Sequence, residues 1–298
     1  MSRALALLLV VAAGCAPSTA PDDDARPKAV ATISILSDFV AAVAGDRIDV
    51  EPIVHVGGDP HTYEPVPSDP RRVAEADVVF RNGLGLERWL DRLIEGSRVV
   101  TLTEGLDATI TQTGQYSGDP DPHLWMDPHL ARGYVANARD ALVELDPAGA
   151  QTYRDNADAY LRELDELDAW ISEQVGTIPA PNRKLVTTHD AFRYFGQRYG
   201  LDVVGTIWSI STEREPSAEE VARLVDDVKA HAVPTVFIET TVNPRIMQRV
   251  ARDAGVEVGE PLYGDSVGEP GSGADSYIGM MRANVRAIVS GLGGRTRG

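Results

Sequence analysis

Short runs rich in valine and isoleucine alternate along the first half of the chain with segments whose apolar residues recur every three or four positions. The runs predict strands over 28–34, 48–55, 77–82 and 98–103. The helical spacing predicts helices over 36–44 and 86–96, and a further helix that Ser68 caps. Alternating strands and helices are typical of a parallel sheet with helices on its faces.

A much longer helical pattern occupies residues 146–177. Its apolar residues recur at steps of three or four and fall on one helix face: Tyr153, Ala157, Tyr160, Leu164, Leu167, Ile171 and Val175. A helix of about 28 residues is about 42 Å long, enough to run the length of a domain. The prolines at 179 and 181 end it.

The second half repeats the alternation of the first half without a recognisable sequence repeat. Its predicted strands are 184–188, 201–208, 235–241 and 256–263, and its predicted helices are 189–200, 217–230, 244–255 and 276–292. We therefore predict an α/β protein with two Rossmann-like lobes of parallel strands, at 29–145 and 179–298. The segment 146–178 joins them as one long backbone helix.

The N-terminus has the pattern of an export signal. Arg3 precedes an apolar run over residues 4–13 that is too short to span a bilayer, and Gly14 and Cys15 follow it. This pattern resembles a lipoprotein signal, so we predict a signal peptide over 1–14 and lipidation of Cys15. Residues 15–28 are rich in Pro, Ala and Asp and predict a flexible tether. The alternative is an ordinary secretory signal cleaved near Ala20.

These predictions place the protein outside the cell, anchored to the outer face of the membrane.

The composition of the chain excludes some kinds of site. Cys15 is the only cysteine, which excludes internal disulfides and a multi-cysteine zinc site. The formal charge of −17 offers no basic surface for nucleic acid, so we predict no nucleic-acid partner.

Four residues that suit a metal ion follow predicted strands. They are His61, His123, His189 and Asp265, two from each half of the chain. In open α/β sheets, functional residues gather beyond the carboxyl ends of the strands, so both lobes are able to present ligands to one point in the cleft between them. Three imidazoles and a carboxylate suit a first-row divalent ion such as Zn²⁺, Mn²⁺ or Fe²⁺.

The remaining histidines have simpler interpretations. His55 ends a strand, His129 opens a helix after Pro128, and His231 closes a helix, where a cation suits the helix dipole. A single histidine at a strand end usually caps or hydrogen-bonds. Only His129 competes with His123, from which it is six residues away.

Five motifs together resemble the metal-specific (zinc and manganese) solute-binding lipoproteins of ABC importers. They are GGDPHTYEP, DPHLWMDP, VTTHDAFRYF, VFIETTV and YGDSVGEPGSGADSYIGM, and the likeness extends from about Lys28 to Gly291. The resemblance implies two α/β lobes bridged by one helix, with His61, His123, His189 and Asp265 as metal ligands and Trp125 packed behind them. It also implies a monomeric receptor, without enzymatic activity, that delivers Zn²⁺ or Mn²⁺ to an ABC permease and its ATPase.

The sequence leaves the metal and two other functions open. The stretch before His123 lacks the histidine-rich loop of many zinc receptors, which favours manganese, whereas three neutral imidazoles favour zinc. An exported metallohydrolase would use the same ligands with Glu64 or Asp59 as its base, although HExxH and P-loop motifs are absent from the sequence. The other alternative is a surface adhesin. Glu239 and Asp190 are candidates to orient a ligand.

Overall fold

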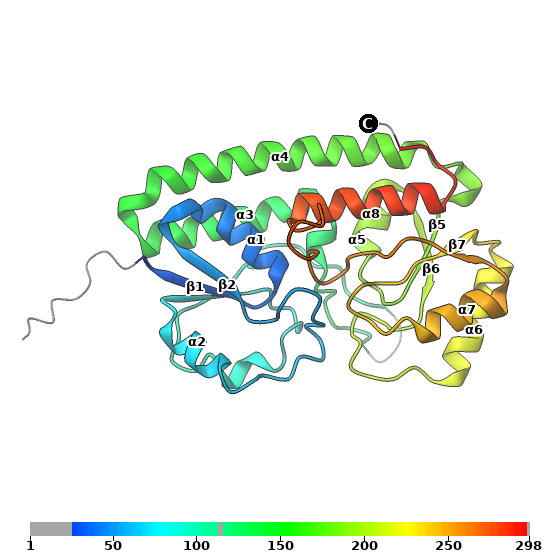
Figure 1. Ribbon diagram of the computed structural model, residues 1–298, viewed down its shortest axis with the longest axis horizontal. Coiled ribbons are helices and arrows are strands. Elements are labelled where there is room, and N and C mark those ends of the chain that lie inside the picture. Colours follow the sequence, from blue (N-terminus) through cyan, green and yellow to red (C-terminus); the bar gives the residue numbers. More distant parts are fainter. Residues whose placement is uncertain (1–25, 113–115, 297–298) are drawn as a thin grey trace, which may run out of the picture.

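The computed structural model describes residues 26–112 and 116–296 as two α/β lobes beneath one long helix (Figure 1). The first lobe contains a parallel sheet with strand order β2-β1-β3-β4. Its strands are β1 (Lys28–Ala31), β2 (Asp49–Pro52), β3 (Val78–Arg81) and β4 (Val99–Thr101). Its helices are α1 (Ser34–Ala44), α2 (Asp69–Glu75) and α3 (Pro128–Leu145).

The second lobe has shorter strands, paired β5 with β6 and β7 with β8, all parallel. The strands are β5 (Lys184–Thr187), β6 (Asp202–Thr206), β7 (Thr235–Val236) and β8 (Glu257–Val258). The N–H of Phe237 donates to the carbonyl of Val186 over 2.9 Å, which joins the two pairs. The helices are α5 (Arg193–Tyr199), α6 (Ala218–Ala230), α7 (Arg245–Ala254) and α8 (Tyr277–Gly291).

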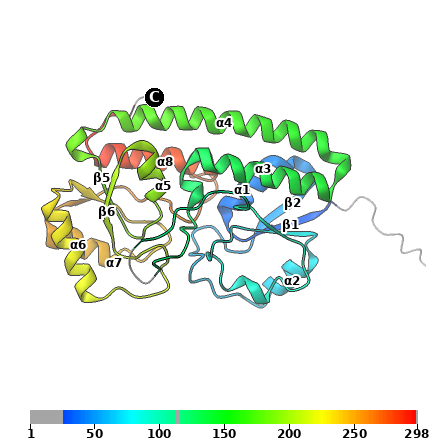
Figure 2. The same ribbon diagram turned by 180° about the vertical axis from the view of Figure 1, so that it is seen from behind.

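Helix α4 (Ala150–Gly176) runs along both lobes (Figures 1 and 2). It lies inside the predicted linking segment and packs against α1 and α3 of the first lobe and α8 of the second. Six of the seven residues of its predicted apolar face are buried, and Tyr160 is half-buried. One apolar core continues through both lobes under this helix, so α4 holds the lobes in a fixed relation.

The helix predicted over 86–96 is wrong. Only a 3₁₀ turn at Leu90–Arg92 forms there. The cause is Glu87, whose buried carboxylate accepts the N–H groups of Asn82 (2.7 Å) and Gly83 (3.0 Å) and the hydroxyl of Thr32 (2.7 Å). The carboxylate pins the chain back onto the end of β3, which an amphipathic helix starting at 86 would not allow.

Three smaller predictions also need correction. Ser68 precedes α2 but makes no side-chain cap; instead the carboxylate of Asp69 accepts the N–H of Val66 over 2.8 Å. The strands predicted over 235–241 and 256–263 form only as two-residue pieces, extended by one bridge between Glu239 and Leu262. Apart from this bridge, the remaining residues of the two predicted strands form irregular backbone.

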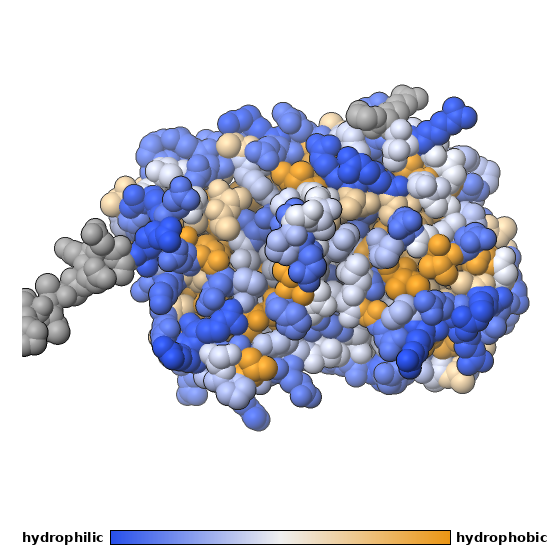
Figure 3. Space-filling model, in the orientation of Figure 1, coloured by the Kyte–Doolittle hydropathy of each residue, from blue (hydrophilic) through white to orange (hydrophobic). Residues whose placement is uncertain are grey.

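The visible face of the molecule is largely hydrophilic, with apolar patches scattered over it (Figure 3). Within residues 26–112 and 116–296, no helix has the length and apolar character to cross a bilayer. The predicted signal peptide and Cys15 lie outside the described residues.

Candidate metal centre

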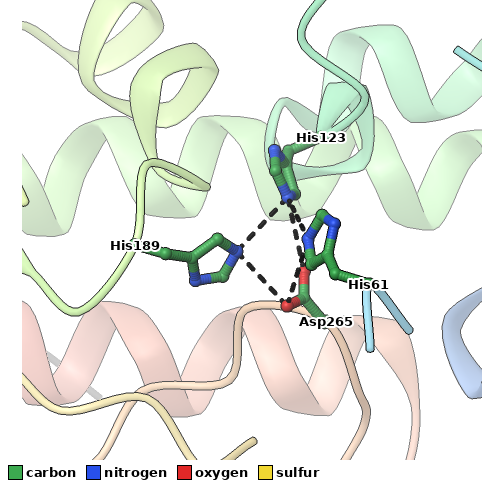
Figure 4. A group of neighbouring side chains, drawn as sticks. All are labelled: His61, His123, His189 and Asp265. Carbon is green, nitrogen blue, oxygen red and sulfur yellow. Dashed lines mark hydrogen bonds and ion pairs between the residues drawn. The ribbon is translucent and has the colours of Figure 1, made fainter. Parts of the chain in front are cut away.

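The four predicted ligands come together where the two lobes face one another (Figure 4). His61 follows β2, His123 directly precedes a 3₁₀ turn at Leu124–Met126, and His189 follows β5. Asp265 lies between β8 and α8. One nitrogen or oxygen atom from each residue lies within 4.8 Å of all the others, and all four residues are buried.

The spacing of these atoms matches a shell around one ion. Nε2 of His123 lies 3.3 Å from Nε2 of both His61 and His189. The carboxylate of Asp265 lies 3.2 Å from Nε2 of His189, 3.5 Å from that of His123 and 3.8 Å from that of His61. Tetrahedral ligands about 2.0–2.1 Å from a zinc ion are about 3.3 Å apart. The five separations therefore fit a single small cation at the centre.

Two of the four donors, Asp265 and His61, are in the chemical state that binds a cation. Both carboxylate oxygens of Asp265 are buried without a hydrogen-bond partner. Burial would raise the pKa of Asp265, but the facing His189, His61 and His123 outweigh burial and lower it, so the group is ionised. Burial lowers the pKa of His61 to about 3, which leaves its imidazole neutral. An ionised carboxylate beside neutral nitrogen is what a divalent metal ion requires.

Two buried carboxylates support the ligands from behind. Oδ1 of Asp121 lies 2.8 Å from Nδ1 of His123, and Oε2 of Glu239 lies 2.7 Å from Nδ1 of His189. The hydrogen bond to Asp121 fixes the proton of His123 on Nδ1 and turns its Nε2 toward the cluster. The contact of Glu239 with His189 is a close approach of opposite charges, which favours a proton on Nδ1 of His189. Burial opposes charge on His189, yet Glu239 and Asp265 raise its pKa well above the ordinary value. A binding cation must therefore displace a proton from His189.

Trp125 links the loops that carry two of the ligands. Its ring packs edge-on against His123, with centroids 5.2 Å apart, and its Nε1–H donates to the carbonyl of Gly264 over 2.9 Å. The hydroxyl of Tyr277 donates to the carbonyl of Trp125 over 2.6 Å. A Cβ at position 264 would lie 2.3 Å from Oε2 of Glu239, so a residue larger than glycine would displace the carboxylate that contacts His189. The expected packing of Trp125 behind His123 is confirmed.

The other histidines lie outside this cluster. His55 and His129 are exposed, and the N–H of His129 donates to Asp127, which caps α3. Nδ1 of His231 lies 2.9 Å from the carbonyl of Asp227 at the end of α6. Asp190, a candidate to orient His189, pairs with Arg193 instead.

The supporting role of Asp121 was missed, although the sequence carries a signal for it. The tripeptide Asp-Pro-His occurs three times, at 59–61, 121–123 and 127–129. In each case the aspartate accepts the N–H of its own histidine, over 2.9, 3.1 and 2.8 Å, in an Asx turn. The repeat identifies histidines whose backbone is held by a turn. Asp121 also contacts the imidazole of its histidine, which the repeat alone does not predict.

The model of the family described as zinc-uptake complex component A, periplasmic, matches residues 29–291. The chain belongs to this family. It is 45% identical to the manganese-binding lipoprotein MntA of Halalkalibacterium halodurans, over 98% of this chain and 97% of that relative. It is 36% identical to the iron-binding protein YfeA of Yersinia pestis, over 98% of this chain and 96% of that relative.

The fold of a solved protein agrees with the fold of this chain. The periplasmic zinc-binding protein TroA from Treponema pallidum matches with a TM-score of 0.85 and 28% sequence identity, over 90% of this chain and 99% of that chain. The predicted resemblance to metal-specific solute-binding proteins of ABC importers is therefore confirmed, as is the fold of two α/β lobes with a backbone helix. The three relatives are named for three metals: manganese, iron and zinc.

Proposed function

We propose that this protein is an extracytoplasmic receptor that captures one divalent transition-metal ion and delivers it to an ABC permease driven by its ATPase. The ligands are His61, His123, His189 and Asp265. The observation that carries the proposal is the closed cluster of four donors, in which the two buried oxygens of Asp265 face the Nε2 atoms of the three histidines. Such oxygens are costly to bury unless a cation or donor meets them.

The donor set favours Zn²⁺ or Mn²⁺ as the cargo. Three imidazole nitrogens and one carboxylate oxygen supply a tetrahedral shell for Zn²⁺. Both oxygens of Asp265 face the histidines, so a bidentate carboxylate would supply the additional ligand that Mn²⁺ accepts. We expect Zn²⁺ to bind at least as tightly as Mn²⁺, following the usual order of affinities.

The site suits binding better than hydrolysis. A catalytic metal keeps an open position for water and needs a nearby base, whereas four protein ligands here surround one point. Glu64 is exposed, and both oxygens of Asp59 are engaged, by the N–H of His61 and the hydroxyl of Thr212. These contacts support a receptor rather than a metallohydrolase.

We also propose that the receptor is a monomer anchored by lipid on Cys15. The name of the MntA relative, a lipoprotein, supports this anchoring. If residues 1–14 are removed and Cys15 carries a diacylglyceryl group, the measured mass of the mature protein should exceed that of residues 15–298 by the mass of this group.

Isothermal titration of chelator-stripped protein tests the proposal. One Zn²⁺ should bind per chain and release a proton, because the pKa of His189 is raised well above its ordinary value by Glu239 and Asp265, against the effect of burial. As pH rises through that raised pKa, the competing proton is lost and affinity increases. The affinity should therefore still increase above about pH 7.5, where a histidine with the ordinary pKa of about 6.5 is already largely neutral.

The proton release is measured by repeating the titration in buffers with different ionisation enthalpies. Absence of saturable binding, or binding of several ions per chain, would contradict the receptor function. Binding that no longer changes above about pH 7.5, one unit above the ordinary histidine pKa, would show that His189 is not the residue that loses a proton.

A further inference from the structure

The four residues of the metal centre are closed to solvent, and a crevice lined by one of them leads away from it. His61 is 6% exposed, and the other three ligands are 0–1% exposed. A crevice of about 10 Å³ is lined by His61 and, on either side of it, by Tyr116 and Pro122 of the first lobe and Ile210 and Ser211 of the second. Among the four ligands, only His61 lines it. An ion that leaves by this crevice must pass His61.

Besides the two bonds of Tyr194, which accepts the N–H of Thr109 and donates to the carbonyl of Asp121 over 2.9 Å each, two hydrogen bonds connect the lobes beside this crevice. The hydroxyl of Thr212 donates to Oδ2 of Asp59 over 2.6 Å, and the hydroxyl of Tyr116 donates to Oε2 of Glu213 over 3.4 Å. The Thr212 bond is short and half-buried, whereas the Tyr116 bond is long and exposed. Thr212 therefore makes the stronger of the two connections.

The same carboxylate also holds the backbone of a metal ligand. Oδ1 of Asp59 accepts the N–H of His61 over 2.9 Å while Oδ2 accepts the Thr212 hydroxyl. His123 and His189 are held by carboxylates at their rings, through Asp121 and Glu239. His61 is instead held through its main chain, by an aspartate that the opposite lobe fixes in place.

The lobes are tied differently on the other side of the centre. There the N–H of Gly57 donates to Oγ of Ser266 over 2.8 Å, and Oγ of Ser34 lies 3.1 Å from the same atom. The N–H of Val267 donates to Ser34 over 3.1 Å. These contacts are largely buried and surround Asp265 with a network. The connection through Thr212 is a single half-buried hydrogen bond, so it is easier to break than this network.

We propose that Thr212 is a positioning residue: its bond to Asp59 is a latch between the lobes that holds His61 over the ion and sets the rate of release. Breaking the latch frees Asp59, loosens the loop of His61 and widens the crevice. A permease that binds at this face would release the ion by displacing the short segment around Thr212. This inference rests on the proposed function, because it assigns a release route to the same metal centre.

The rate of zinc release tests the latch. The full chain, loaded with one Zn²⁺, is mixed with an excess of a chromogenic zinc chelator in a stopped-flow instrument. The variant Thr212→Val keeps the shape of the side chain and removes the donor. We expect its dissociation rate to rise about tenfold, the effect of losing a hydrogen bond to a carboxylate, with a much smaller change in the association rate. Thr212→Ser keeps the hydroxyl and should remain within about threefold of wild type.

The outcomes separate the latch from the proposed function. If wild type holds Zn²⁺ but Thr212→Val releases it at the wild-type rate, the latch is wrong and the receptor function stands. If Thr212→Ser releases as fast as Thr212→Val, the methyl contact matters rather than the hydrogen bond, and the latch is again wrong. If wild type holds no Zn²⁺, the proposed function and the latch fail together. Thr212→Ala provides the same test if the valine variant does not fold.

Discussion

Replacing His123 by alanine is expected to weaken Zn²⁺ binding by more than about 100-fold, whereas replacing His129 by alanine should change it by less than about threefold. Loss of a residue that merely supports a ligand typically costs about 10- to 100-fold, so loss of a ligand costs more. Nε2 of His123 lies within 3.5 Å of a donor atom on each of the other three ligands. His129 is exposed and outside the cluster.

The two histidines form a matched pair because they occupy the same turn-rich stretch, each after an Asp-Pro dipeptide. Affinity is measured by competition with a chelator of known strength, and circular dichroism checks that each variant is folded. Equal affinities for the two variants, or a greater loss with His129→Ala, would place the metal centre elsewhere.

Replacing Glu239 by glutamine is expected to weaken Zn²⁺ binding by about 10- to 100-fold. Glu239 contacts the Nδ1 of His189 over 2.7 Å, and its other oxygen accepts the N–H of His189 over 2.8 Å. Glutamine keeps the size of the side chain but removes its negative charge. That charge orients the ring of His189 and makes its Nε2 a stronger electron donor to the metal. Both groups are buried, so water does not replace the lost interaction.

Asp190→Asn is the control for this variant. Asp190 is next to His189 in the chain, but it pairs with Arg193 rather than with a ligand. Its substitution should leave affinity within about threefold of wild type. The same chelator competition measures both variants. An equal loss of affinity in both variants would show that any negative charge near His189 has the same effect on metal binding. The specific contact of Glu239 with the ring would then not orient it.

The long helix and the clustering of the four candidate ligands could be predicted because they depend on local rules. The face of α4 appears in the sequence as a regular apolar repeat, and tertiary packing only confirms which side is buried. The four ligands follow strand ends, and parallel strands place their carboxyl ends along one edge of a sheet. The repeated Asp-Pro-His tripeptide also fixes its histidine by a bond between residues two positions apart.

The contact between Glu239 and His189 could be named from the sequence only as a candidate, because the two residues are far apart in the chain. Glu239 lies in a predicted strand and meets a histidine 50 residues away, and no local pattern pairs the two residues. The helix wrongly predicted over 86–96 has the same origin. Its apolar spacing is correct for a helix, but a buried Glu87 that binds Thr32, 55 residues away, overrides the local preference.

A thermal-melt titration of chelator-stripped protein with Zn²⁺, Mn²⁺ and Mg²⁺ tests the central claim most directly. An ion that binds only the folded protein stabilises it by about 2.7 kcal/mol at 100 times its Kd. For a chain of this size that corresponds to a rise in Tm of roughly 5–10 °C. The metal centre predicts such a rise with Zn²⁺ and with Mn²⁺, and none with Mg²⁺, which prefers oxygen ligands. An unchanged Tm with all three ions would contradict a metal receptor built on His61, His123, His189 and Asp265.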